Sequence, residues 1–86
     1  MTGITHGGRR TLDFYTTDGC HLCDQALEML WPVAERRGFT VAPREIIGDA
    51  AAESAYGERI PVVRRADSGR ELFWPFSETD LYRFLL

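Results

Sequence analysis

The sequence predicts an α/β fold with the element order βαβαββα, in which four strands form one mixed sheet flanked by helices. Three observations lead to this prediction. Apolar residues alternate in short β-branched segments, they recur at helical spacing in other segments, and turn residues separate the two kinds. A length of 86 residues allows one modest core, so residues 10–86 are expected to form a single domain and residues 1–9 a flexible tail.

The first half of the chain begins with a strand and a long helix. Apolar and polar residues alternate over Thr11–Thr16, which predicts the strand, and residues 17–19 form a turn. Apolar residues follow helical spacing from Cys20 to about Arg37, and Gly38 is expected to end that helix. Pro32 lies inside it and lacks a backbone N–H, so we expect a kink or a new start in the last turn.

A second strand is predicted over residues 39–47. Pro43 confines this strand to an edge of the sheet, because a central strand would need the N–H that proline lacks. The strand, helix, strand order implies a parallel pair with a right-handed crossover. A short helix over residues 50–56 follows, with Asp49 as its expected N-cap and Gly57 as its stop.

The last part of the chain predicts an antiparallel hairpin and a final helix. The strands cover residues 59–65 and 70–74, and a turn joins them at residues 66–69. The Ser77–Asp80 segment has the pattern of a capping box, which marks a helix start. The apolar residues after it have helical spacing: Leu81, Phe84 and Leu85.

The charge pattern argues against two classes of partner. All ten basic residues are arginines and 13 residues are acidic, which gives a net charge of −3 with no basic run. Nucleic acids and membranes are therefore not expected partners. No segment approaches the ~18 apolar residues of a membrane span, and the polar N-terminus lacks an apolar signal region. With only two cysteines, the expected location is the reducing cytoplasm.

Those two cysteines, Cys20 and Cys23, lie at the junction of the first strand and the first helix. The free N–H groups and the dipole of the helix start favour the thiolate of Cys20, so its pKa should fall below the usual ~8.5. Cys23 lies one turn further on the same face, within disulfide range of Cys20. This spacing predicts a redox-active dithiol with Cys20 as the nucleophile and Cys23 as the resolving thiol.

Nearby charged residues are candidates for tuning the thiolate of Cys20. A protonated His21 would stabilise it, whereas an exposed His21 turned away would have no role, and the sequence leaves both possibilities open. The candidate cations are Arg59 and either Arg9 or Arg10. Arg59 would act as a substrate clamp or thiolate partner, or else be a solvated loop charge.

Half of a metal site is the alternative explanation of the cysteine pair. Structural zinc takes four ligands, and beyond the cysteines only His6 and His21 are histidines. We therefore expect no metal site and no bound cofactor. A function of another class also remains open: a non-catalytic binding module, or a carrier of a metal or an iron–sulfur cluster.

The chain resembles the glutaredoxin family, and more closely a branch of short glutaredoxin-like proteins with Cys-His-Leu-Cys as their motif. The resemblance covers residues 11–86 and rests on that motif at residues 20–23, on Tyr-Gly-Glu-Arg-Ile-Pro-Val-Val at residues 56–63, and on the hairpin at residues 67–72. It implies a thioredoxin-like fold and a thiol–disulfide oxidoreductase. It also implies that the Ile60–Pro61 bond is cis and faces the cysteines, with the Ile60 backbone pairing with substrate.

The resemblance also bears on partners. It implies a protein or low-molecular-weight disulfide as substrate and a reducing partner, with a monomer as the expected state. Glutathione-using members carry a Gly-Gly pair and a Lys, where this chain has Trp-Pro-Phe-Ser at residues 74–77 and Thr-Thr-Asp at residues 16–18. Whether glutathione serves as co-substrate, or a reductase takes its place, stays open from the sequence.

Overall fold

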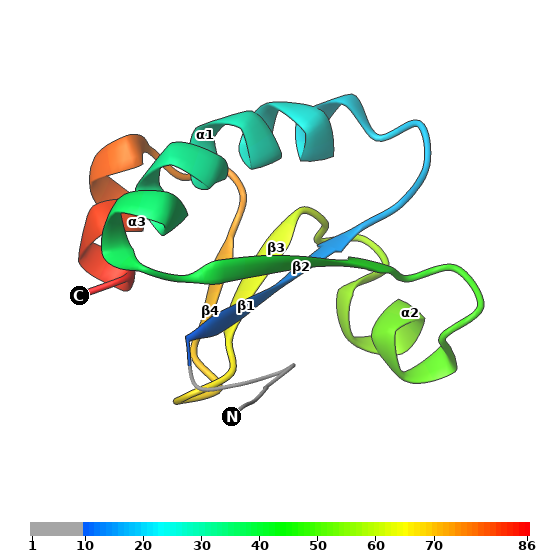
Figure 1. Ribbon diagram of the computed structural model, residues 1–86. Helices are drawn as coiled ribbons and strands as arrows, with labels where there is room; N and C mark the ends of the chain where they lie inside the picture. The colour runs from blue at the N-terminus through cyan, green and yellow to red at the C-terminus, as the bar shows by residue number, and fades with distance from the viewer. Residues whose placement is uncertain (1–9) are drawn as a thin grey trace.

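A computed structural model describes residues 10–86 of the chain. Its element order, βαβαββα, is the predicted one (Figure 1). The four strands form one sheet in the order β2-β1-β3-β4. In chain order the elements are β1 (Thr11–Thr16), α1 (His21–Arg37), β2 (Thr40–Glu45), α2 (Ala50–Tyr56), β3 (Val62–Arg65), β4 (Glu71–Phe73) and α3 (Glu78–Phe84).

The sheet is mixed, as predicted. β1 pairs in parallel with β2 and antiparallel with β3, and β3 pairs antiparallel with β4. Pro43 lies in the edge strand β2, opposite Phe14 of β1. The edge position confirms the argument from the missing N–H of proline. Three strands are shorter than the predicted ranges 39–47, 59–65 and 70–74, although some flanking residues still form single backbone hydrogen bonds, as Ile46 does with Thr16 at 3.0 Å.

One face of the sheet packs against α1 and α3, which lie next to each other at the C-terminal end of α1 (Figure 1). Side chains alternate across a strand, so Leu12 and Phe14 of β1 share this face. Both are at most 1% exposed. The core they join draws on α1, β3 and α3 as well, and it includes Ala26, Leu30, Val33, Val63, Leu81 and Phe84.

The opposite face of the sheet is partly covered by α2. Tyr15 alternates with Phe14, so it points to this second face. The ring of Tyr56 in α2 stacks on the ring of Tyr15, with centroids 4.4 Å apart. Figure 1 shows α2 at the end of the sheet opposite α3. Helices therefore flank both faces, and α2 lies at the end where β1 leads into α1.

Helix α1 corrects two details of the prediction. It begins at His21, and Cys20 is its extended N-cap residue rather than its first helical residue. It also continues through Pro32 to Arg37 without a new start. Pro32 and Glu28, four residues earlier, are both exposed, so water can reach the Glu28 carbonyl that proline leaves without an N–H donor. Gly38 ends the helix with a left-handed φ of 76°.

The two short helices begin with the predicted caps. The side chain of Asp49 accepts a hydrogen bond from the Ala52 N–H at 3.1 Å, which caps α2. Ser77 and Asp80 form the reciprocal hydrogen bonds of a capping box at α3, at 3.1 and 2.9 Å. The predicted flexible tail, residues 1–9, lies outside the described residues. Within residues 10–86, no helix has the length and apolar character needed to cross a bilayer.

Candidate dithiol site

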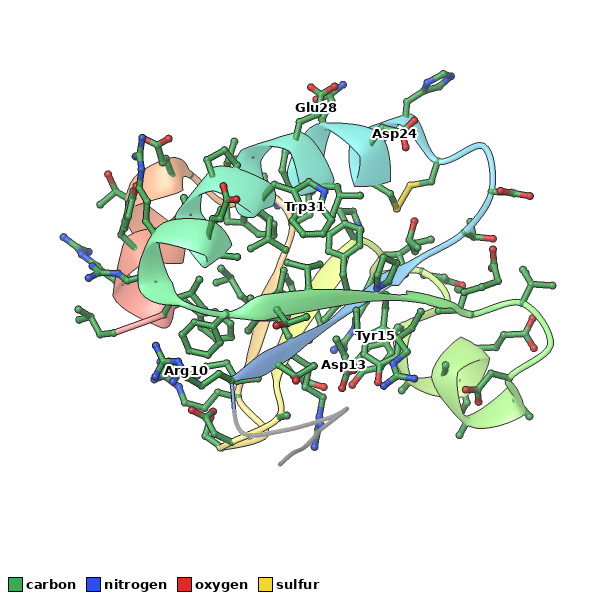
Figure 2. All side chains as sticks on the ribbon, in the orientation of Figure 1. Arg10, Asp13, Tyr15, Asp24, Glu28 and Trp31 are labelled. Carbon is green, nitrogen blue, oxygen red and sulfur yellow. A yellow bond between two sulfur atoms is a disulfide. The ribbon has the colours of Figure 1, made fainter. Side chains whose placement is uncertain are left out.

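Cys20 and Cys23 form a disulfide at the start of α1, with their Cα atoms 5.2 Å apart. Figure 2 shows this bond in yellow where the loop after β1 enters the helix. Gly19 supplies the turn before it, with φ of 76°, a conformation that favours glycine. Cys20 then takes the extended N-cap conformation, and its sulfur accepts the Cys23 N–H at 3.1 Å. A sulfur here occupies the place usually taken by a serine or aspartate oxygen.

The two cysteines differ in their access to solvent. Cys23 is 1% exposed and belongs to the core, whereas Cys20 is partly exposed. An incoming disulfide can therefore approach Cys20 but not Cys23. The buried sulfur of Cys23 lies within bonding distance of the Cys20 sulfur.

A hydrogen bond joins the loop before Cys20 to Glu45 at the end of β2. Glu45 accepts hydrogen bonds from the backbone N–H of Asp18 at 3.2 Å and of Ile47 at 2.9 Å. The Ile47 bond makes the largest contribution, and together with a bond from Thr17 and the Asp18 bond it lowers the pKa of Glu45. The Glu45 carboxylate therefore stays ionised beside this loop at neutral pH.

A cavity of about 440 Å³ borders the Cys20–Cys23 segment through Leu22. Leu22, which lies between the two cysteines in the sequence and is 47% exposed, forms one wall. Ile60 and Trp74 also line the cavity, and they pack against the same core as Cys20. The apolar lining comes from three separate segments of the chain: Leu22, Ile60, Phe73 and Trp74. Glu58 and Arg59 contribute its charged groups.

The segment that leads into β3 brings the predicted substrate-binding residues to this cavity. Ile60 lines it, the Ile60–Pro61 peptide bond is cis, and Pro61 is fully buried. Trp74 donates its backbone N–H to the Pro61 carbonyl at 3.3 Å, which joins this segment to the end of β4. The Trp74–Pro75 bond is also cis, and nothing in the sequence indicated it.

The predicted charged residues have different positions. Arg59 lines the cavity, and its guanidinium lies 5.2 Å from the centroid of the Phe73 ring. His21 is exposed as the first residue of α1, and no hydrogen bond or ion pair joins its side chain to any other residue between 10 and 86. The prediction that Arg10 lies near Cys20 is wrong. It donates a hydrogen bond to the Gly38 carbonyl at 3.0 Å, at the other end of α1.

The sequence also offered Arg9 as a cation near Cys20 and His6 as a metal ligand. Arg9 and His6 lie outside the described residues. Among residues 10–86, no group of three or more His, Cys, Asp or Glu side chains is placed to hold a metal ion. The sequence did not identify Glu58 as a cavity residue, and it left Trp74 either as a core aromatic at the end of a strand or as part of an exposed patch for a partner. The signals for Glu58 were its position directly before Arg59 and its place in the 56–63 segment that carries the family resemblance.

Comparison with known proteins gives the following matches. Residues 11–86 match the family described as Glutaredoxin-like domain (DUF836). A structural-genomics target protein from X. campestris shares 49% sequence identity with a TM-score of 0.73, over 86% of this chain and 93% of that chain. A protein from Nitrosomonas europaea shares 26% identity with a TM-score of 0.75, over 100% of this chain and 99% of that one. No curated protein matches the chain.

More distant structures extend the likeness of fold. Thioredoxin 1 from Thermosipho africanus shares 14% identity with a TM-score of 0.66, over 85% of this chain and 86% of that chain. At this identity the match concerns the fold alone. Together with the family match, it confirms the predicted thioredoxin-like fold and the resemblance to glutaredoxins.

Proposed function

The chain belongs to the glutaredoxin-like domain family, and from that premise we propose that it is a thiol–disulfide oxidoreductase. The observation that carries the proposal is the unequal exposure of the two bonded cysteines. Cys20 is partly exposed at the N-terminus of α1, and Cys23 is 1% exposed behind it. One sulfur is thus open to a substrate while the other can reach only its partner.

The reaction begins with the reduced dithiol. The Cys20 thiolate attacks one sulfur of the substrate disulfide, so a Cys20–substrate bond forms, the substrate bond breaks, and one substrate thiol leaves after taking a proton. Cys23, as thiolate, then attacks the Cys20 sulfur and displaces the second substrate thiol. The two electrons come from the dithiol, which ends as the Cys20–Cys23 disulfide.

The start of α1 supports the first step. The Cys23 N–H already points at the Cys20 sulfur, and the positive end of the helix dipole lies there. Both favour a negative sulfur over a neutral thiol. The cavity beside the Cys20–Cys23 segment supplies a place for the groups that flank the substrate disulfide, with the Ile60 segment and Arg59 along its edge.

A second reductant must return the disulfide to the dithiol. We propose that a low-molecular-weight thiol such as glutathione, or a protein reductase, does so in the cytoplasm, where thiols are kept reduced. Comparing the rate of re-reduction by glutathione with that by a thioredoxin-type reductase system would distinguish these two partners.

The test compares two matched variants, Cys23→Ser and Cys20→Ser. Each variant is reduced and mixed with the neutral bis(2-hydroxyethyl) disulfide. The reaction is quenched with acid, and the mass of the protein is measured by mass spectrometry. Cys23→Ser should accumulate a mixed disulfide at Cys20 because its resolving thiol is missing. Cys20→Ser should form none and should lose reductase activity. If Cys20→Ser kept full turnover, the nucleophile assignment would be wrong, and if the wild-type protein reduced no disulfide, a non-catalytic binding role would replace the proposal.

A further inference from the structure

The cavity beside the Cys20–Cys23 segment has an apolar lining broad enough to receive a side chain. Leu22 borders it, and Ile60 and Trp74 add further apolar surface from two other segments of the chain. An apolar group that enters this space removes both surfaces from water, which favours binding in proportion to the area buried. A residue next to the substrate cysteine is the one that lies within reach.

The two charged residues of the cavity are not equivalent. The guanidinium of Arg59 lies over the ring of Phe73, a contact that holds the side chain in place but leaves its positive charge unpaired. Glu58 is exposed, and no ion pair within residues 10–86 neutralises it. The carboxylate of Glu58 is therefore the group of the cavity that can pair with a cation on a bound substrate.

The surroundings strengthen the preference for a positive partner. Asp24 follows Cys23 directly and lies beside the disulfide in Figure 2, and Asp18 and Glu45 border the loop before Cys20. None of the three has an ion-pair partner in the part of the chain that the structure describes. Asp18, Asp24, Glu45 and Glu58 are thus four carboxylates without an ion-pair partner among residues 10–86, against the single arginine of the cavity, and they give a negative field. Such a field attracts cationic partners and repels anionic ones.

Resting on the proposed function, we propose that the preferred substrate is a peptide or protein disulfide flanked by one apolar and one basic residue. The apolar side chain enters the cavity between Leu22 and Trp74, and the basic side chain pairs with Glu58. Oxidised glutathione has the opposite character, because it carries a net negative charge and no apolar side chain. The covalent steps are those of the dithiol reaction above and require no further reactant.

The test uses synthetic peptides, each closed by one disulfide and identical except for two positions beside a cysteine. One series holds Leu constant and places Arg, Gln or Glu next to it; a further peptide replaces Leu by Ser in the Arg peptide. Single-turnover oxidation of the reduced protein is followed for each, and each rate is divided by that of the same peptide with dithiothreitol. This ratio removes differences in the intrinsic reactivity of the disulfides.

At low ionic strength we expect the Arg peptide to react about tenfold faster than the Glu peptide, with Gln between them. High salt should reduce this difference, because it screens exposed charges. The Ser-for-Leu peptide should react more slowly than its Leu parent. Equal ratios for all charges would overturn the basic part of the proposal, and equal ratios for Leu and Ser would overturn the apolar part.

Glu58→Gln tests the residue itself, and Glu35→Gln is the matched control. Glu35 is also exposed but lies on α1 about 22 Å along the helix from Cys20. Glu58→Gln should lower the rate of the Arg peptide about two- to fivefold and leave the Gln peptide unchanged. Glu35→Gln should change neither. If Glu58→Gln behaved like Glu35→Gln, the assignment of Glu58 would fail. If the wild-type protein reduced no peptide and no neutral disulfide, the proposed function itself would fail, which is a separate outcome.

Discussion

The backbone N–H of Cys23 points at the sulfur of Cys20, 3.1 Å away, at the first turn of α1. This contact makes the cysteine sulfur the cap of the helix. When the disulfide is reduced, the same N–H can stabilise a negative sulfur on Cys20, whereas the Cys23 sulfur lies in the core and has no such position. One hydrogen bond thus gives the two cysteines different chemistry.

The first prediction is that Cys20 is alkylated faster than Cys23 in the reduced protein. Iodoacetamide reacts with exposed thiolates, and only Cys20 is both accessible and capped by backbone N–H donors. Peptide mapping by mass spectrometry after short exposure should find the label on Cys20, with half of the maximal rate reached below about pH 8.5. In urea the two rates should become similar. Equal rates in the folded protein would contradict the assigned roles.

The second prediction concerns Arg65, a charged residue that is 9% exposed. Its guanidinium donates to the carbonyl oxygens of Phe84 and of Leu86, the latter at 3.2 Å, and forms an ion pair with Asp67. Arg65→Met leaves these acceptors without a donor, so we expect the free energy of unfolding to fall by about 1–3 kcal/mol. Urea denaturation measures the change.

Two further variants make the Arg65 prediction specific. Arg65→Lys keeps the charge but not the planar fork, so its loss of stability should be smaller than that of Arg65→Met. Arg83→Met removes an exposed arginine from α3 and should change stability by no more than about 0.5 kcal/mol. If Arg83→Met lowered the free energy of unfolding as much as Arg65→Met, the cause would be the loss of a positive charge in general and not the contacts of Arg65 with the end of α3.

The dithiol could be predicted from the sequence because its signals are local. Strand alternation ends at Thr16, helical spacing begins near Cys20, and both cysteines fall at that junction. Capping patterns are also local, which is why the start of α3 at Ser77 was predicted correctly. Such signals need only a few neighbouring residues.

The cavity could not be predicted in the same way. Leu22 meets Ile60 and Trp74 only after the strands have paired, and no periodicity within one segment encodes that distance. The error at Arg10 has the same origin. It is ten residues from Cys20 in the sequence, but β1 lies between them, and six extended residues span about 20 Å. Proximity along the chain therefore gave the wrong position for this cation.

The third prediction is a dependence of stability on acid pH through Asp67. Hydrogen bonds from Arg65 lower the pKa of Asp67 to about 2, compared with about 3.9 for an unfolded aspartate. The folded state therefore binds this proton less readily than the unfolded state. The stabilisation is complete above about pH 4 and is lost as the pH falls toward 2. Urea unfolding should find wild type more stable than Asp67→Asn at pH 6, with the difference shrinking toward pH 2. A difference that stayed constant would mean that the carboxylate charge is not responsible.

The fourth prediction concerns alkaline pH, where the pKa of Tyr56 is raised rather than lowered and stability is lost as the pH rises. Burial, followed by the hydrogen bond from its hydroxyl to Glu71, raises the pKa of Tyr56 to about 12, compared with about 10 when unfolded. The folded state holds this proton more tightly, so its stabilisation is complete below about pH 10 and is lost as the pH rises toward 12. Ultraviolet titration of phenolate should show a tyrosine that ionises near pH 12, and Tyr56→Phe should remove that step. Glu71→Gln should move it to lower pH, because the negative acceptor that disfavours phenolate is gone. An unchanged step in Glu71→Gln would leave burial as its only cause.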